Sequence, residues 1–236
     1  MRELNIPVTT HGRILIDEGD AGPFDSARGG AADVAQDRPL KLLVGCHGYA
    51  QNAGEMMEML RGIPAGSGPA HRSLGGGGWT RVSVQALHRF YRGRSQVSVA
   101  SWMTSQDREL MIGDNVAYLD AAVAGVAGGR AIERLVYLGF SQGVAMAFRA
   151  GLRGARPADA VLALGGDVPP ELFADAGVTF PQVLLARGTR DEWYSAAKLE
   201  ADEAALRTRG ARVQTLTFDG AHEWHLDFAS RAAQYL

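Results

Sequence analysis

The fold of this protein is built around one segment, Arg134-Leu-Val-Tyr-Leu-Gly-Phe-Ser-Gln-Gly-Val-Ala-Met-Ala-Phe-Arg-Ala-Gly-Leu-Arg-Gly154. Residues 135–138 form an unbroken apolar or aromatic run, which predicts a parallel strand buried on both faces. A helical pattern of apolar side chains begins at Val144 and stops at Gly154, with Pro157 just beyond it. The stretch therefore predicts a strand, a tight turn and a helix in immediate succession.

The turn itself reads Gly139-Phe-Ser-Gln-Gly143, the G-x-S-x-G pattern of a nucleophile elbow. Glycine is needed at both flanks because a Cβ there would strike the neighbouring strand or helix. The pattern holds Ser141 at a strained tip, where its Oγ is exposed and the following N–H groups can meet an oxyanion. In a chain with 30 glycines the five residues alone are weak support, and a solvated serine in a glycine-rich connection is the alternative.

Composition narrows the class of protein. The 236 residues are 46% hydrophobic and no linker divides them, so we expect a single α/β domain over 1–236. A net charge of −2 argues against a nucleic-acid partner, and we expect neither a signal peptide nor a membrane span. Cys46 is the one cysteine, which excludes intramolecular disulfides and favours a reducing, cytoplasmic location. Phosphate-loop and dinucleotide-binding patterns are absent, and no cofactor is expected.

The remaining segments alternate between buried strands and amphipathic helices. This alternation predicts an α/β fold whose mostly parallel central sheet carries helices on both faces, without a large lid domain. At the N-terminus, 4–8 and 13–16 read as an edge hairpin, and the basic, aromatic segment 88–94 reads as a loop rim. The Thr104-x-x-Asp107 pattern starts a long helix that buries Leu110, Val116 and Leu119. Predicted strands are 40–46, 82–87, 160–164, 181–186 and 212–218; further helices are 54–60, 195–209 and 223–236.

Three chemically suited residues follow strands in the order nucleophile, acid, base: Ser141, Asp191 and His222. In a parallel sheet the carboxyl ends of the strands gather the chemistry. A serine hydroxyl needs a histidine to take its proton, and a buried carboxylate fixes the histidine tautomer. Asp167 is the alternative acid and His225 the alternative base. A metal site built on the two histidines is the less favoured interpretation, and we expect no metal.

An oxyanion hole requires two N–H donors. Gln142, which follows the nucleophile, supplies one. The loop after the 40–46 strand supplies the other through the Tyr49 amide. The side chain of His47 is expected to be a structural group.

Four motifs in chain order resemble those of the phospholipase/carboxylesterase family, which includes acyl-protein thioesterases. Ser101-Trp102 is similar to the tryptophan that this family carries near its acyl-binding cleft, which implies that Trp102 binds substrate. The resemblance also implies an α/β-hydrolase fold and a Ser-His-Asp hydrolase that acts on esters or thioesters without a cofactor. The chain differs from the family at Val144, where a second glycine is usual, and at Gln51, where an aspartate is common. The motifs are Cys46-His-Gly-Tyr49, Gly139-Phe-Ser-Gln-Gly143, Gly188-Thr-Arg-Asp191 and Gly220-Ala-His-Glu223.

We therefore expect a carboxylic ester hydrolase for small-molecule esters with short to medium acyl chains, working through an acyl-enzyme. An acyl thioesterase or lysophospholipase with the same triad is the enzyme alternative, and a hydrolase-fold binding protein is the non-catalytic one. The loop 61–78 and the aromatics Tyr49, Trp102, Trp193 and Trp224 are expected to wall the cleft. The oligomeric state stays open, with a homodimer among the alternatives.

Overall fold

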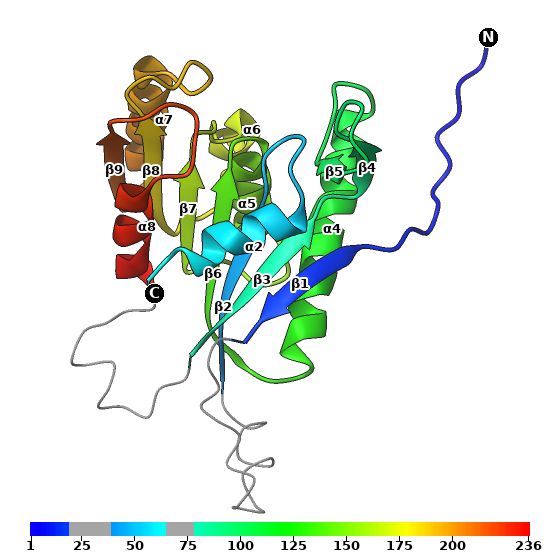
Figure 1. Cartoon of the computed structure of the whole chain (residues 1–236), viewed down its shortest axis with the longest axis horizontal. Helices are drawn as coiled ribbons and strands as arrows, with labels where there is room; N and C mark the ends of the chain where they lie inside the picture. The colour runs from blue at the N-terminus through cyan, green and yellow to red at the C-terminus, as the bar shows by residue number, and fades with distance from the viewer. Residues whose placement is uncertain (19–38, 65–77) are drawn as a thin grey trace, which may run out of the picture.

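One seven-stranded sheet organises the computed structural model, which describes residues 1–18, 39–64 and 78–236 (Figure 1). Its strand order is β1-β3-β2-β6-β7-β8-β9. Every neighbouring pair is parallel except β1 and β3, which run antiparallel. The strands are β1 (Arg13–Asp17), β2 (Leu40–Cys46), β3 (Trp79–Gln85), β6 (Ile132–Phe140), β7 (Ala160–Leu164), β8 (Gln182–Gly188) and β9 (Val213–Phe218).

Helices cover both faces of this sheet, as the alternation of strands and helices predicts. On one face α2 (Ala53–Arg61) and α8 (Leu226–Ala232), which continues into a 3₁₀ turn (Ala233–Tyr235), pack on one set of buried side chains. On the other face, α4 (Arg108–Ala127), α5 (Gln142–Arg153), α6 (Pro170–Ala174) and α7 (Ala196–Thr208) contribute to a second, larger cluster. The described residues therefore form three layers with a core on each side of the sheet.

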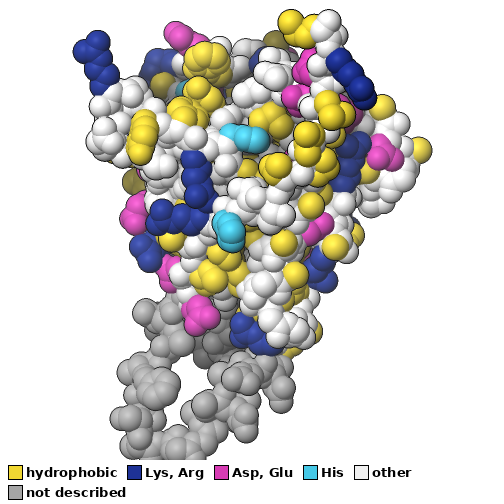
Figure 2. All heavy atoms as spheres, turned by 90° about the vertical axis from the view of Figure 1, so that its right-hand side faces the viewer, with side chains coloured by type: hydrophobic (Ala, Val, Ile, Leu, Met, Phe, Trp, Pro, Cys, Tyr) yellow, Lys and Arg dark blue, Asp and Glu magenta, His cyan; other side chains and the backbone are white. Residues whose placement is uncertain are grey.

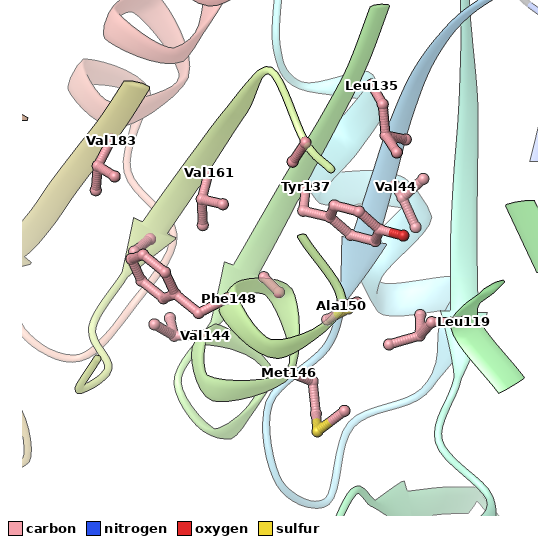
Figure 3. Packing of buried hydrophobic residues seen from close by; sticks show 14 of the residues in the cluster. Val44, Leu119, Leu135, Tyr137, Val144, Met146, Phe148, Ala150, Val161 and Val183 are labelled. Atoms are coloured by element: carbon pink, nitrogen blue, oxygen red, sulfur yellow. The ribbon is translucent and has the colours of Figure 1, made fainter. Parts of the chain in front are cut away.

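The larger core explains why the central strands read as continuous apolar runs. Tyr137 of β6, Val161 of β7 and Phe148 of α5 are buried side chains of this cluster (Figure 3). A strand covered by helices on both faces has no solvent side to carry polar residues. This packing fixes the end of β6, and with it the turn that holds Ser141.

Two expectations for the edge of the sheet are wrong. Residues 4–8 form no strand; β1 pairs with β3 instead, for example Ile14 with Val84, because a long-range partner with a buried face outcompetes a local hairpin. The segment 88–94 is not simply a loop rim. His88–Tyr91 is strand β4 and pairs antiparallel with β5 (Ser98–Ser101).

Helix α4 also differs from its expected form. It begins at Arg108, and its N-cap Asp107 has φ 51° and makes no side-chain cap. Leu110 is exposed, whereas Leu119 is buried as expected and Val116 is partly buried. By length and composition alone α4 could cross a membrane, which is weak evidence for a span, and Leu119, Ala122 and Val123 of this helix lie in the larger core. Figure 2 shows this side of the molecule, where hydrophobic side chains are interspersed with polar and charged ones.

Candidate active site

The turn between β6 and α5 is strained at Ser141. This residue has φ 53° and ψ −120°, a conformation that few non-glycine residues adopt, and its N–H donates to the Leu164 carbonyl at 2.9 Å. A Cβ at Gly139 would lie 2.5 Å from the Val144 Cα, and one at Gly143 would lie 2.0 Å from the Cys46 carbonyl oxygen. Both flanking positions therefore require glycine for the steric reason that the sequence pattern indicates.

The structure brings Asp191 and His222 together. Asp191 Oδ2 lies 2.9 Å from His222 Nδ1, and the Asp191 side chain is almost fully buried. Its other oxygen, Oδ1, accepts the backbone N–H groups of Trp193 and Tyr194, both at 2.9 Å. With both oxygens engaged, the carboxylate can turn neither away from the histidine nor away from its own loop.

Buried Arg187 fixes the loop that carries this aspartate, although nothing in the sequence pattern singled it out. Its guanidinium donates to the carbonyls of Tyr194 at 2.7 Å, Thr189 at 3.2 Å and Asp191 at 3.3 Å. The position of an arginine at the end of a buried strand could have indicated this role, because a buried guanidinium needs several acceptors.

The alternative acid and base make other contacts, although Asp167 lines the same cavity as Ser141. Asp167 is exposed and paired with Lys198 Nζ at 3.1 Å. His225 is the N-cap of α8: its Nδ1 accepts the Asp227 N–H at 3.2 Å, and its ring stacks on Phe218. The closing helix was expected to begin at 223, so the position of His225 before the first turn is a correction. No group of three or more His, Cys, Asp or Glu that could hold a metal occurs among the described residues.

Two glycines after β7 connect the Ser141 elbow to the Asp191–His222 pair. A Cβ at Gly165 would lie 3.0 Å from His222 Cε1 and 3.2 Å from Asp191 Oδ2, whereas one at Gly166 would lie 2.4 Å from the Ser141 carbonyl oxygen. The His222 ring also packs on Phe140, the residue before the serine, with 5.1 Å between ring centroids. Ser141 Oγ has no hydrogen-bond partner in the described part of the chain. In hydrolases without bound substrate, the hydrogen bond between the serine and the histidine is often long and shortens only when substrate binds.

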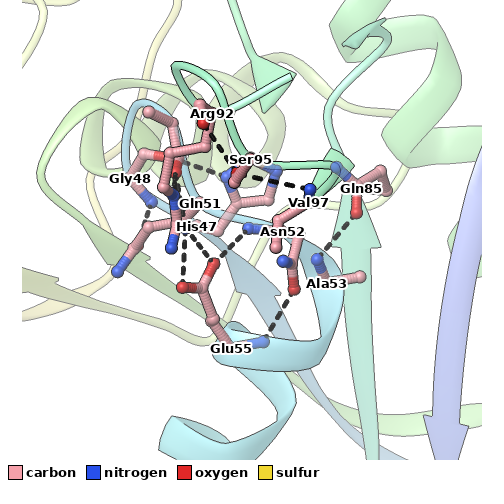
Figure 4. A network of polar contacts seen from close by, with 11 residues as sticks. His47, Gly48, Gln51, Asn52, Ala53, Glu55, Gln85, Arg92, Ser95 and Val97 are labelled. Atoms are coloured by element: carbon pink, nitrogen blue, oxygen red, sulfur yellow. Dashed lines mark hydrogen bonds and ion pairs between the residues drawn. The ribbon is translucent and has the colours of Figure 1, made fainter. Parts of the chain in front are cut away.

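The loop after β2 lies beside the serine. A Cβ at Gly48 would be 3.3 Å from Ser141 Cβ, and the Gly48 N–H is held at 2.7 Å by Gln51 Oε1 (Figure 4). The glutamine at this position therefore orders the loop. The amides of Tyr49 and Gln142, the two expected oxyanion donors, have no acceptor among the described residues. Both are free to receive a ligand oxygen.

His47 is fully buried and its ring is bonded on both sides. Nδ1 lies 2.7 Å from the Gly48 carbonyl and Nε2 accepts the Ala86 N–H at 3.1 Å, so the neutral ring with its proton on Nδ1 fits both partners. Burial lowers the pKa of His47 below its usual range. The adjacent Cys46 is buried as well, and burial raises the pKa of its thiol. Both residues support the strand end and neither offers a reactive group.

Trp102 is fully buried, in contrast to the position expected of a substrate-binding residue. Its indole N–H donates to the His47 carbonyl at 2.7 Å, and its backbone N–H donates to Gln142 Oε1 at 2.9 Å. Gln142 Nε2 in turn donates to the Met103 carbonyl at 2.9 Å. Trp102 therefore links the strand end at His47 to the first turn of α5, and its ring offers no exposed surface to a ligand in the described structure.

A cavity of about 250 Å³ opens at the serine, lined by residues that include Ala145, Trp193 and Lys198. Among the four aromatics expected around the cleft, Tyr49 and Trp193 are exposed, whereas Trp224 is partly buried against Phe228. Residues 65–77 of the expected loop wall lie outside the described residues.

Solved structures share this architecture, although no protein-family model and no curated protein matches the sequence. A phospholipase/carboxylesterase from Dyadobacter fermentans is 17% identical with a TM-score of 0.64, over 98% of this chain and 98% of that one. The Bacillus cereus carboxylesterase is 15% identical with a TM-score of 0.61, over 95% and 92% of the two chains. Esterase PE8 is 22% identical with a TM-score of 0.62, over 84% and 91%. The chain therefore has the α/β-hydrolase fold that these structures share.

Proposed function

We propose that this protein is a carboxylic ester hydrolase in which Ser141 is the nucleophile, His222 the general base and Asp191 the residue that orients the base. The observation that carries the proposal is the 2.9 Å contact between Asp191 Oδ2 and His222 Nδ1 beside a serine with φ 53°. A buried carboxylate on Nδ1 keeps the proton there and leaves Nε2 free to accept one. The names of the structural neighbours, esterase and carboxylesterase, agree with this reaction class.

The proposed reaction has two half-reactions. Ser141 Oγ attacks the ester carbonyl carbon while its proton passes to His222 Nε2. The carbonyl oxygen becomes an oxyanion and accepts hydrogen bonds from the Tyr49 and Gln142 amides. The C–O bond to the alcohol then breaks, and His222 returns the proton to the leaving alcohol. A water molecule attacks the acyl-enzyme in the same way, which releases the acid and restores the serine.

The cavity at the serine supports a proposal for the substrate class. It is small, and its most exposed apolar side chain is Trp193. Each methylene that an acyl chain buries contributes only about 0.8 kcal/mol, so a cavity of this kind discriminates weakly between neighbouring chain lengths. We propose short to medium acyl esters as substrates. Comparing kcat/KM for matched esters, acyl thioesters and lysophospholipids decides among the enzyme alternatives.

The decisive experiment is the Ser141→Ala variant, assayed with nitrophenyl esters of graded acyl length. We expect kcat to fall by about 10⁴ to 10⁶ with the fold intact. Ser230→Ala, which removes an exposed serine hydroxyl on α8, is the matched control and should keep full activity. An organophosphate should modify Ser141 alone, as read by peptide mass spectrometry. Near-normal turnover in Ser141→Ala would overturn the proposal and favour the non-catalytic alternative.

A further inference from the structure

A second cavity is bordered by Asn52, which ends the loop that follows β2. It has a volume of about 360 Å³ and is formed between β1, the end of β3, the first turn of α2 and the β4–β5 hairpin. The residues that matter here are Arg13, Arg89, Asn52, Gly54 and Gln85. None of them lines the cavity at Ser141. The two cavities are therefore separate, and the second one is polar and basic.

The lining of this cavity includes Gln85, whose side-chain amide has an unused donor. Gln85 is 5% exposed, and its Oε1 accepts the Ala53 N–H at 2.8 Å (Figure 4). Because the Ala53 amide is a donor, the orientation of the Gln85 side chain is fixed with Nε2 on the other side. Nε2 has no hydrogen-bond partner among the described residues. Buried amide groups are rarely left unpaired, so this donor indicates an acceptor that the site binds.

The charges around the cavity are also unbalanced. Arg13 and Arg89 make no ion pair with any described residue; the Arg89 guanidinium donates to the His11 carbonyl at 2.9 Å. The acidic side chain in the first turn of α2 is Glu55, and its carboxylate is already bound by Arg92 Nη2 at 2.7 Å and by the Asn52 N–H at 2.9 Å. Figure 2 looks onto this side of the molecule and shows basic side chains on it. Two cationic side chains thus border the cavity without a carboxylate partner.

The start of α2 adds a third kind of donor. The amides of Ala53 and Glu55 are capped by Gln85 and Asn52, whereas the Gly54 amide has no acceptor among the described residues. The N-terminal end of a helix favours negative charge because its free N–H groups and its dipole point toward the ligand. Glycine at this position lets a ligand approach the backbone closely.

We propose that this cavity is a binding site for a small oxyanion, a carboxylate or phosphate group. It is held by the Arg13 and Arg89 guanidiniums, the Gly54 amide and the Gln85 Nε2 amide. Guanidinium forks and backbone amides are the donors that such anions prefer in proteins. The proposal does not depend on the hydrolytic reaction, since no residue of the triad lines the site.

The test is titration of the full chain with inorganic phosphate and, in a parallel arm, with acetate, at constant ionic strength set with sodium chloride. Calorimetry should show saturable binding of one anion per chain. Stronger binding of phosphate would assign the site to phosphate-bearing ligands, and stronger binding of acetate would assign it to carboxylates.

Two variants decide whether this cavity is the site. Gln85→Glu keeps the acceptor for the Ala53 amide but replaces the free donor with a carboxylate oxygen, so it should abolish binding. Arg89→Met should weaken binding about tenfold to a hundredfold, the size expected for a charge-assisted hydrogen bond. Arg94→Met removes an exposed arginine in the β4–β5 turn, outside the cavity, and should bind like the wild type.

Arg89 lies on the surface, so its variant reports on the site even if Gln85→Glu fails to fold. Absence of saturable binding of either anion to the wild type would overturn the proposal. Equal binding by wild type, Gln85→Glu and Arg89→Met would overturn it as well, because it would place the anion elsewhere.

Discussion

Replacing Asp191 with asparagine tests the candidate triad most sharply, because the two residues have the same shape. Asp191 Oδ1 accepts two backbone N–H groups and Oδ2 faces His222 Nδ1. In Asp191→Asn the oxygen will stay on the two N–H donors. Turning the amide over would place its NH₂ group against both of them and leave two buried donors unpaired, at about 1–3 kcal/mol each.

The asparagine NH₂ group must then face His222 Nδ1, and this has a chemical consequence. Nδ1 becomes an acceptor, the imidazole proton moves to Nε2, and Nε2 can no longer take the proton of Ser141. Loss of the correct tautomer in a triad costs about 10⁴ in kcat, which corresponds to about 5.5 kcal/mol of transition-state stabilisation. The folded structure should be retained, since the hydrogen bonds within the loop are kept.

The assay is steady-state hydrolysis of a short-chain nitrophenyl ester, with circular dichroism to check the fold. Asp167→Asn is the matched control: it removes an exposed carboxylate that pairs with Lys198, and we expect kcat within about threefold of the wild type, as for a surface ion pair. More than about a tenth of wild-type activity in Asp191→Asn would show that Asp191 does not fix the tautomer of His222. A larger loss in Asp167→Asn than in Asp191→Asn would transfer the acid role to Asp167.

Three further perturbations probe the support of the site. Gly166→Ala places a Cβ 2.4 Å from the Ser141 carbonyl oxygen, so we expect a destabilisation of about 1–3 kcal/mol in urea unfolding together with reduced turnover; an unchanged midpoint would contradict this. Trp102→Phe leaves the buried His47 carbonyl without its donor, and should lower the free energy of unfolding by about 1–3 kcal/mol while the acyl-length profile of kcat/KM stays the same. A changed profile would instead place the ring at the acyl chain. Because the pKa of His47 is lowered in the folded protein, the unfolded chain binds a proton at this residue more readily than the folded protein does. The buried, neutral His47 ring therefore contributes fully to the free energy of unfolding above about pH 6.5, and this contribution is lost as the pH falls below that value. Urea unfolding between about pH 7.5 and 5.5 should show this loss, and a His47→Gln variant should show a flatter profile.

The sequence predicted the sheet well where strands are buried on both faces. The 160–164 strand has the expected bounds because its apolar residues form an uninterrupted segment. The helix after Ser141 ends before Gly154 as expected, because glycine commonly ends a helix. The β4–β5 hairpin was missed because its first strand is exposed and basic, so it lacks the alternation that marks a half-buried strand. The edge strand β1 was assigned the wrong partner, since local patterns do not show long-range pairing.

For the site, chain order and strand ends indicated Asp191 and His222, which are in contact, while the catalytic roles stay predictions. Asp191 contacts His222 and Asp167 does not, in line with the preference for the later strand. The burial of Trp102 could not be derived in this way. The resemblance to the family gives the position of this tryptophan along the chain, but it does not tell whether the indole ring is buried or exposed to substrate. The Gly165-Gly166 pair was visible in the sequence, but only the packing shows that a side chain there would strike Ser141 or His222.

The hydrogen bonds of the Gln142 side chain to Trp102 and Met103 affect the dynamics of the protein. The side-chain amide joins the first turn of α5 to Trp102 and Met103 at the end of the β4–β5 hairpin, and Trp102 is bonded in turn to the strand end at His47. Three segments far apart in the chain are thereby tied by hydrogen bonds that open only together. In native-state hydrogen exchange, the backbone amides of these three segments should become accessible as one cooperative unit. A Gln142→Ala substitution would then release the hairpin to exchange separately from the elbow helix.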